Sequence, residues 1–267
     1  MLYIKDLSYH PAATPTAILK SINLELAPKQ LGLIVGPSGS GKSTLLEILA
    51  GLARKSSGSI QWRNQTLNVE QLQQLGGLVF QFPERHFCCG SMADELRLGH
   101  PELTKERMEE ILDAVGLAHI PMTTAPQALS GGQQRRLSLA VQLIRQPYLL
   151  LLDEPTAGLD WSMRQQLVAL LAELKKQWSL LIVTHDASEL ISIADRCWTI
   201  DHGEITAMDP HELKRSLSEK SVTLQANKAQ AVQDDNTQAV QSVGTVVGDP
   251  NPIDAVNPKI IISRSVA

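Results

Sequence analysis

A glycine-rich segment near the N-terminus has the residue types that bind the phosphates of a nucleotide. It fits the pattern G-x-x-x-x-G-K-[ST] and reads Gly36-Pro37-Ser38-Gly39-Ser40-Gly41-Lys42-Ser43-Thr44. Glycines let the backbone wrap around phosphate oxygens, so that consecutive N–H groups and a helix N-terminus point at the anion. In this pattern Lys42 reaches the β- and γ-phosphates and the Ser43 hydroxyl ligates Mg²⁺. The segment lies between an apolar run and a helical pattern, which disfavours the alternative of a Gly/Ser-rich linker.

Two carboxylates follow a second apolar run. Residues 149–152 are all leucine and precede Asp153 and Glu154. In an open parallel sheet the carboxyl ends of the strands form the ligand crevice. We therefore expect Asp153 to hold Mg²⁺ through water and Glu154 to take a proton from an attacking water. An acidic pair at the end of a strand is, by itself, as often a solvated turn as a metal site. The presence of the segment 36–44 favours the metal site here.

A third segment supplies a second helix N-terminus. It reads Leu129-Ser130-Gly131-Gly132-Gln133-Gln134-Arg135-Arg136. Ser130 can cap a helix whose first residues are glycines, which leaves N–H groups free at its positive end. The segment therefore predicts an anion site distinct from the first, against the simpler interpretation of a loop-to-helix junction.

These three segments, in this order and spacing, resemble the ATP-binding cassette (ABC) family over about residues 1–216. The resemblance implies an α/β P-loop NTPase fold, with a mainly parallel core sheet, an N-terminal antiparallel β-subdomain and a helical subdomain inserted at about 82–146. It implies ATP hydrolysis, with ATP and Mg²⁺ as cofactors. In the family the segment at Ser130 contacts the γ-phosphate of ATP held by the opposite subunit. The chain therefore needs a partner, in a homodimer or a heterodimer with another ABC ATPase, to close a site.

The resemblance also implies roles for residues outside the three segments. Gln81 matches the residue that senses Mg²⁺ and water, and His185 matches the switch histidine that touches the γ-phosphate. Asp160 lies in the loop through which subunits signal across the dimer. Tyr9 is the candidate for the ring that stacks on adenine, with His10 as the alternative.

Three sets of residues follow from these assignments. Catalysis is expected from Lys42, Gln81, Glu154 and His185. ATP binding is expected from Gly36 through Thr44, Tyr9, Ser130, Gly131, Gly132, Gln133 and Asp160. Mg²⁺ binding is expected from Ser43, Gln81 and Asp153.

The elements that must position these residues alternate between short apolar runs and longer helical patterns, which indicates α/β structure. Strands are expected at Leu2–Ser8, Ile22–Leu26, Leu31–Val35, Ser59–Arg63, Gly77–Gln81, Leu149–Asp153, Leu180–Thr184 and Cys197–Asp201. Helices are expected at Lys42–Ala50, Ser91–Leu98, Lys105–Val115, Gly131–Arg145, Met163–Gln177 and Ala187–Ala194.

In transporter members of the family, the groove beside the residue that corresponds to Gln81 receives a short helix from a membrane subunit. The resemblance therefore implies an integral membrane partner that contacts the Gln81 to Ser91 region. Phe82 and Phe87 offer apolar contact there or, equally, belong to the subdomain core. Residues 81–84 and 156–160 most resemble ATPases of energy-coupling-factor importers, which take up vitamins or divalent metals. The alternative is a soluble ABC ATPase that acts in assembly or mechanical remodelling.

The composition of the chain excludes several other classes of protein function. The 267 residues carry a net charge of -4 and are 43% hydrophobic. A nucleic-acid partner would require a basic face, which this charge balance does not indicate. The longest aliphatic runs are far shorter than a membrane span, and the N-terminus does not resemble a signal peptide. We expect a cytoplasmic protein, peripheral on the inner face of the cell membrane.

Two further regions lie outside the family motifs. Three cysteines form no disulfide framework. A metal site at His86, Cys88 and Cys89 is disfavoured because adjacent cysteines chelate poorly and the spacing matches no zinc pattern. Residues 217–267 are of low complexity and are expected to be largely disordered, with 260–262 as either a short strand or a contact point.

Overall fold

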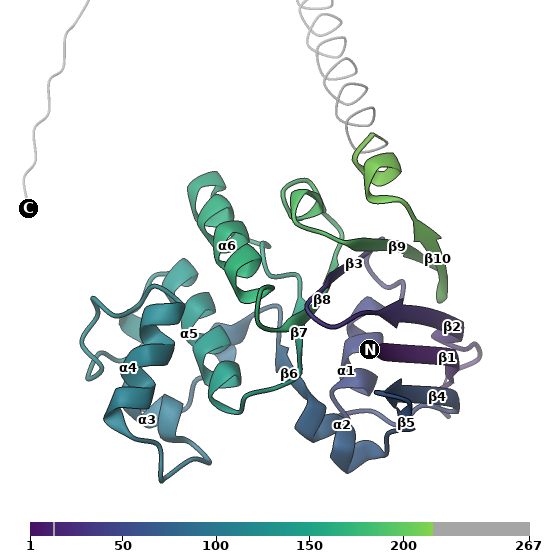
Figure 1. Ribbon diagram of the computed structural model, residues 1–267. Coiled ribbons are helices and arrows are strands. Elements are labelled where there is room, and N and C mark those ends of the chain that lie inside the picture. The colour runs from purple at the N-terminus through teal and green to yellow at the C-terminus, as the bar shows by residue number, and fades with distance from the viewer. Residues whose placement is uncertain (13, 216–267) are drawn as a thin grey trace, which may run out of the picture. The chain divides into compact units, whose positions relative to one another are not determined.

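Two β-sheets organise the chain, and the helices are distributed around them (Figure 1). The computed structural model describes residues 1–12 and 14–215, which belong to one unit, Met1–Ser218. The predicted tail, 217–267, lies outside the described residues. Within them, no helix is both long enough and apolar enough to cross a membrane.

The strands are β1 (Leu2–Tyr9), β2 (Leu19–Leu26), β3 (Leu31–Val35), β4 (Ser57–Trp62), β5 (Gln65–Thr66), β6 (Gly76–Val79), β7 (Leu149–Asp153), β8 (Ser179–Thr184), β9 (Arg196–Asp201) and β10 (Glu204–Met208). The α-helices are α1 (Lys42–Leu49), α2 (Val69–Leu75), α3 (Met92–Arg97), α4 (Lys105–Ala114), α5 (Gly131–Ile144) and α6 (Trp161–Leu174). Three short 3₁₀ helices are η1 (Pro83–Arg85), η2 (Pro126–Ala128) and η3 (Leu190–Ser192).

The larger sheet has the order β10-β9-β3-β8-β7-β6, and every pairing is parallel except that of β10 with β9. The smaller sheet, β2-β1-β4-β5, is antiparallel. Because β3, β6, β7 and β8 run in the same direction, the residues that follow them leave the sheet at one edge. This edge carries the loop before α1 and the residues Gln81, Glu154 and His185.

The leucine run of β7 is buried because both faces of the larger sheet are covered. Leu149 and Leu151 pack in one hydrophobic cluster, with α1, α2 and the smaller sheet. Leu150 and Leu152 pack in another, with helices α3 to α6. In Figure 1, α1 lies between the two sheets. Alternate side chains of one apolar strand thus join the two halves of the core.

The helical insertion lies between β6 and β7, and its three helices, α3, α4 and α5, gather on one side of the larger sheet (Figure 1). The predicted caps are present, since Ser91 Oγ accepts from Asp94 N at 3.1 Å and Thr104 Oγ1 accepts from Arg107 N at 3.3 Å. The predicted fold class, including the antiparallel sheet and the inserted helices, is confirmed.

The predicted helix Ala187–Ala194 is wrong, because only the short η3 forms there. Ser188 N and Ser188 Oγ both bond to Asp186 Oδ1, at 3.1 and 2.5 Å, and such local side-chain bonds compete with helical backbone bonds. The strand predicted to reach Gln81 ends at Val79 instead.

One α-helix and two strands of the described residues were not predicted, nor were the short η1 and η2. Helix α2 was missed because it is polar apart from two buried leucines, although the capping box of Asn68 and Gln71 marks its start. Strands β5 and β10 show no alternation of buried and exposed residues. They form because β4 and β9 offer a free edge for pairing.

Candidate active site

The glycine-rich loop joins β3 to α1, which begins at Lys42. Gly41 has a φ of 101°, and a Cβ there would lie 2.7 Å from Leu19 Cδ2, so the turn into the helix requires glycine. The Lys42 side chain is 6% exposed, and its Nζ donates to the carbonyls of Gly36 and Pro37, both at 2.8 Å. The ammonium group is therefore held within the curve of the loop.

A cavity of about 480 Å³ opens over this loop, and it is called the phosphate-loop cavity below. It is lined by Ile18, Ser38, Gly39, Gly41, Lys42, Ser43, Thr44, Gln81, Glu154 and His185. Segments far apart in the sequence thus bring all four predicted catalytic residues to one cavity. The walls combine a cation, a carboxylate, an imidazole and backbone N–H groups, which suits a phosphate ester.

Tyr9 and His10 are not among the lining residues of this cavity. Tyr9 ends β1 and packs half-buried against the cluster that contains α1. The His10 Nε2 atom lies 2.8 Å from the carbonyl oxygen of Thr14. Ile18, which sequence reasoning missed, lines the cavity beside Gly41, and its single aliphatic side chain carried no signal in the sequence.

Asp153 ends β7 and is buried beside the loop. Ser43 makes a side-chain hydrogen bond to it, and among the described residues its Oδ1 atom has no partner. Burial is the main cause that raises the pKa of Asp153, and the Glu154 charge adds to it. A hydroxyl beside a buried carboxylate oxygen without a partner is the hard-oxygen donor set that Mg²⁺ prefers. These residues therefore fit the predicted metal.

Glu154 is buried and has a φ of 46°, a conformation that turns the chain sharply after β7. Its Oε2 atom lies 2.8 Å from Thr184 Oγ1 and 2.9 Å from His185 Nδ1. Its Oε1 atom lies 4.0 Å from Lys42 Nζ. The carboxylate predicted to be the base is thus oriented by a hydroxyl and an imidazole, and it faces the phosphate-loop cavity.

Arg135 is a buried residue that sequence reasoning assigned no role. The residue is 6% exposed, and its Nη2 atom donates to the Gln81 carbonyl at 3.1 Å. Nη1 donates to the carbonyls of Pro155 and Ala157, the latter at 2.9 Å. One side chain of α5 thus ties together the segments that follow β6 and β7. A charged residue on the apolar face of a helical pattern was the available signal.

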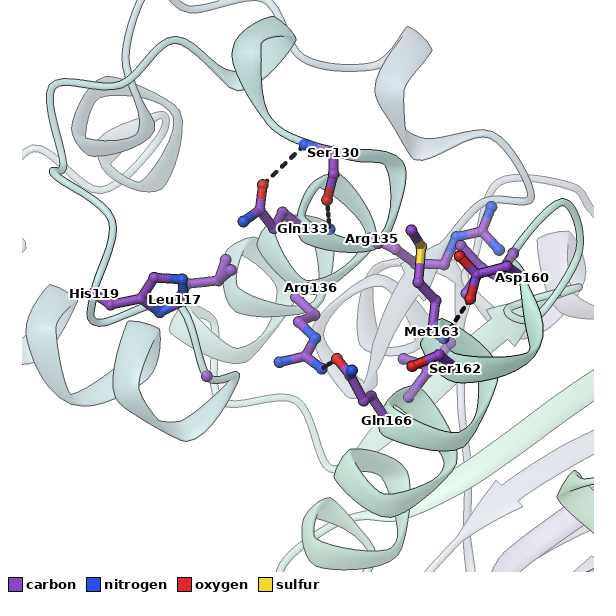
Figure 2. Close-up of a pocket in the computed structure, with 14 residues that line it drawn as sticks. Leu117, His119, Ser130, Gln133, Arg135, Arg136, Asp160, Ser162, Met163 and Gln166 are labelled. Atoms are coloured by element: carbon purple, nitrogen blue, oxygen red, sulfur yellow. Dashed lines mark hydrogen bonds between the residues drawn. The ribbon is translucent and has the colours of Figure 1, made fainter.

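A second cavity, of about 360 Å³, lies at the N-terminal ends of α5 and α6 and is called the Ser130 cavity below (Figure 2). Ser130 Oγ accepts from Gln133 N at 3.4 Å, and Gln133 Oε1 accepts from Ser130 N at 2.9 Å. Asp160 Oδ1 caps α6 by accepting from Met163 N at 2.8 Å. Figure 2 shows these caps together with Arg136, whose Nη2 donates to Gln166 Oε1 at 2.9 Å.

Most of the predicted site residues line one of two cavities, whereas Tyr9, Gly36, Pro37, Ser40, Gly131 and Asp153 line neither. Lys42, Ser43, Gln81, Glu154 and His185 line the phosphate-loop cavity. Ser130, Gly132, Gln133 and Asp160 line the Ser130 cavity, and the two sets of lining residues share no member. Within the described part of one chain, the second predicted anion site therefore does not complete the first.

Comparison with known proteins places these features in a family. The family model described as "ABC transporter" matches residues 19–157. The chloroplastic ABC transporter I family member 11 of Arabidopsis thaliana is 41% identical over 222 residues, which cover 76% of this chain and 78% of the relative. The aliphatic sulfonates import ATP-binding protein SsuB of Pseudomonas putida is 37% identical over 238 residues, covering 88% and 85%. The energy-coupling factor transporter ATP-binding protein EcfA2 of Streptococcus sanguinis is 33% identical over 219 residues, covering 76% and 78%.

Two solved structures are similar over most of this chain. The cbiO1 protein of Clostridium perfringens, part of the ABC transporter complex cbiONQ, superposes with a TM-score of 0.75 at 27% identity, covering 87% of this chain and 98% of that one. The ATP-binding cassette MJ0796, solved as a dimer in a post-hydrolysis state with ADP and Pi, superposes with a TM-score of 0.67 at 26% identity, covering 79% and 99%.

Proposed function

The chain belongs to the ABC transporter family, and from that membership and the phosphate-loop cavity we propose that it is the ATP-hydrolysing subunit of a membrane importer. The ATPase activity is that of the family. The observation that supports the residue roles most directly is the contact of Glu154 with Thr184 and His185 beside Lys42. These groups lie where a triphosphate held by the glycine-rich loop would present its terminal phosphate.

Catalysis in this site is mostly positioning and charge stabilisation. The backbone N–H groups of residues 36–44 and the Lys42 ammonium neutralise the phosphate oxygens. Ser43, Gln81 and Asp153 would hold Mg²⁺, which offsets charge on the phosphates when it is bound. Glu154 takes the proton of the attacking water, and His185 orients that water and contacts the γ-phosphate.

The separation of the two cavities supports a site shared between two chains. The N-terminal residues of α5, from the Ser130 cap through Gly131 and Gly132 to Gln133, lie at the Ser130 cavity, which shares no lining residue with the phosphate-loop cavity of the same chain. In a head-to-tail dimer they would reach the ATP of the other copy, and Asp160 would lie beside the interface between the two chains. This chain carries both halves, so a homodimer is complete, and a heterodimer with another ABC ATPase is its alternative.

The region proposed to contact an integral membrane subunit runs from Gln81 to Ser91. Phe82 is 41% exposed, with the Arg85 guanidinium 4.7 Å from its ring centroid, whereas Phe87 packs against the hydrophobic cluster of the helical insertion. An exposed ring near a cation offers a partner helix an apolar contact and an orienting charge. Phe82, rather than Phe87, is the predicted anchor.

The transported substrate is proposed to be a vitamin or a divalent metal ion. The likeness to EcfA2 and cbiO1 supports an energy-coupling-factor importer, which would place the chain in the cytoplasm on the inner face of the membrane. The likeness to SsuB favours a second candidate, the import of aliphatic sulfonates. Specificity would reside in another polypeptide in either case.

Two experiments test these proposals. Glu154→Gln should form a dimer in saturating MgATP, measured by light scattering after size exclusion, whereas Glu154→Gln combined with Lys42→Ala should remain monomeric. A strictly monomeric Glu154→Gln chain, with any cassette partner supplied, would contradict the shared site. Purification from detergent-solubilised membranes should recover an integral protein that is lost with Phe82→Ser. A wholly soluble complex would instead favour the assembly ATPase.

A further inference from the structure

Two adjacent thiols and a buried carboxylate converge outside the active site. Cys88 and Cys89 precede α3, and Glu95 lies within the first turns of that helix. One ligand atom from each residue, the two Sγ atoms and a carboxylate oxygen, lies within 4.8 Å of the other two. Cys88 is exposed, Cys89 is half-buried and Glu95 is 4% exposed.

The backbone folds over Glu95 and so brings the thiols to it. Glu95 Oε2 accepts from Cys88 N at 3.1 Å and from Cys89 N at 2.9 Å. The two Sγ atoms and a carboxylate oxygen lie within 4.8 Å of one another as a result. Two backbone hydrogen bonds to one carboxylate oxygen therefore hold both cysteines beside Glu95.

This group differs from the set His86, Cys88 and Cys89 that is close together in the sequence. His86 is not part of it, because its ring stacks on Phe80 with the centroids 4.5 Å apart. Glu95 takes the place of the histidine as the third donor. Among residues 1–12 and 14–215, no lysine, arginine or histidine forms an ion pair with Glu95. A buried carboxylate without a cationic partner favours a bound cation.

We propose that Cys88, Cys89 and Glu95 form a three-ligand site for a thiophilic divalent cation such as Zn²⁺, with water as the fourth ligand. Zn–S bonds of about 2.3 Å and Zn–O bonds of about 2.1 Å require the donors of a tetrahedral site to lie roughly 3.5 Å apart. Rotation of the exposed Cys88 side chain and a smaller shift of Cys89 would close the observed spread. The site uses no residue of either cavity, although Cys88 and Cys89 lie within the Gln81 to Ser91 region proposed to contact a membrane subunit.

The affinity should be moderate. The chain supplies three ligands and water takes the fourth position, whereas a structural zinc site has four protein ligands. We expect a dissociation constant on the order of micromolar, weaker than that of a four-ligand structural zinc site.

Cadmium is the probe, because Cd²⁺ bound to thiolates gives an ultraviolet charge-transfer band that oxygen ligands do not give. The full chain, reduced with a phosphine and free of nucleotide, should bind one Cd²⁺ per chain with this band, and Zn²⁺ should displace it. The double variant Cys88→Ser, Cys89→Ser should lose the band. Cys197→Ser is the matched control, because Cys197 is the third cysteine of the chain and is buried in β9.

Glu95→Gln tests the third ligand. Glutamine keeps an oxygen that can accept from the two backbone N–H groups, so the loop should keep its fold, checked by thermal melting. The Cd²⁺ affinity should fall at least about 10-fold, because an amide is a poor ligand for this cation. An unchanged affinity, or a band that survives in the double serine variant, would overturn the proposal. If Glu95→Gln fails to fold, the serine variants and the Cys197→Ser control decide the question.

Discussion

The phosphate-loop cavity and the Ser130 cavity are built from different chemistry. Lys42 and Glu154 line the first and are buried, and beside them the buried Asp153 has a carboxylate oxygen that lacks a partner among the described residues. In the second, the polar atoms of Ser130 and Asp160 are used as caps by their own helices. We therefore propose that the first region carries out bond breaking and that the second recognises an anion presented by another chain.

The contrast teaches that the two functions should be separable by mutation. Changes in the phosphate-loop cavity should act on nucleotide affinity and turnover within one chain. Changes in the Ser130 cavity should act on association between chains. Arg135 is the exception, because it lines the Ser130 cavity and binds carbonyls beside the other one.

The largest effect is expected at Glu154. Glu154→Gln removes the base but keeps the shape of the side chain, so turnover should fall by about 10²–10⁴ while ATP binding is kept. Phosphate release and equilibrium nucleotide binding measure the two quantities. The exposed Glu173→Gln is the control and should leave both unchanged. Turnover near normal in Glu154→Gln would refute the assignment.

The next effect concerns nucleotide affinity. Lys42→Ala removes the cation that the loop holds, and a charged hydrogen bond to phosphate contributes about 1.5–3 kcal/mol. The dissociation constant for ATP should therefore rise by roughly 10- to 100-fold, measured by calorimetry. Lys175→Ala, which breaks a surface pair with Asp195 at 3.0 Å, should leave the affinity as it was. Equal affinities in the two variants would break the comparison.

Arg135→Lys should affect both stability and turnover, because Arg135 contacts the loops that follow β6 and β7. A lysine cannot reproduce a fork that reaches several carbonyls, so unfolding free energy should fall by about 1–3 kcal/mol. Turnover should fall with it while ATP affinity stays within about 2-fold of the original, because Lys42 is untouched. The control is Arg136→Lys, in the next position, which should cost less because Arg136 is only half-buried. A loss of ATP affinity as large as that of Lys42→Ala would contradict this role.

Ser130→Ala should weaken the association of two chains while leaving ATP binding by one chain unchanged. Loss of the cap costs about 1 kcal/mol of stability. The ATP-dependent dimer of Glu154→Gln should weaken by roughly 10-fold or more, while ATP binding by the monomer is retained. Thr104→Ala removes the same kind of cap from α4, which lines neither cavity, and should cost stability alone. Dimers weakened equally by both changes would point to stability rather than recognition.

The smallest effect has the opposite sign. The pKa of Asp153 is raised mainly by burial, so its charged form costs folding free energy above that pKa. Asp153→Asn removes the charge and should stabilise the nucleotide-free chain at pH 7 by about 1 kcal/mol, while binding of MgATP weakens. The gain should shrink as the pH falls through the raised pKa of Asp153, because the wild-type carboxyl group then becomes protonated and its burial no longer costs folding free energy. Thermal melts at several pH values test this, and an unchanged melting temperature would contradict it.

Much of the fold could be predicted because the signals are local. The apolar runs of β3, β7 and β8 identify strands buried on both faces, and the loop at 36–44 needs no distant residue to be recognised. Elements that form only through contacts with distant parts of the chain were harder to predict. The strand β10 forms by pairing with β9, and the predicted helix at 187–194 fails because Ser188 bonds locally to Asp186.

The candidate site divides in the same way. Residue types and spacing determined the phosphate loop, the carboxylates after β7 and the cap at Ser130, because each is a property of a few consecutive residues. The tertiary structure alone decided that Glu154 contacts His185, that Arg135 spans two loops, and that Glu95 meets the two cysteines. Such contacts depend on how elements pack, and packing is set by the sum of many weak burial terms rather than by any short pattern.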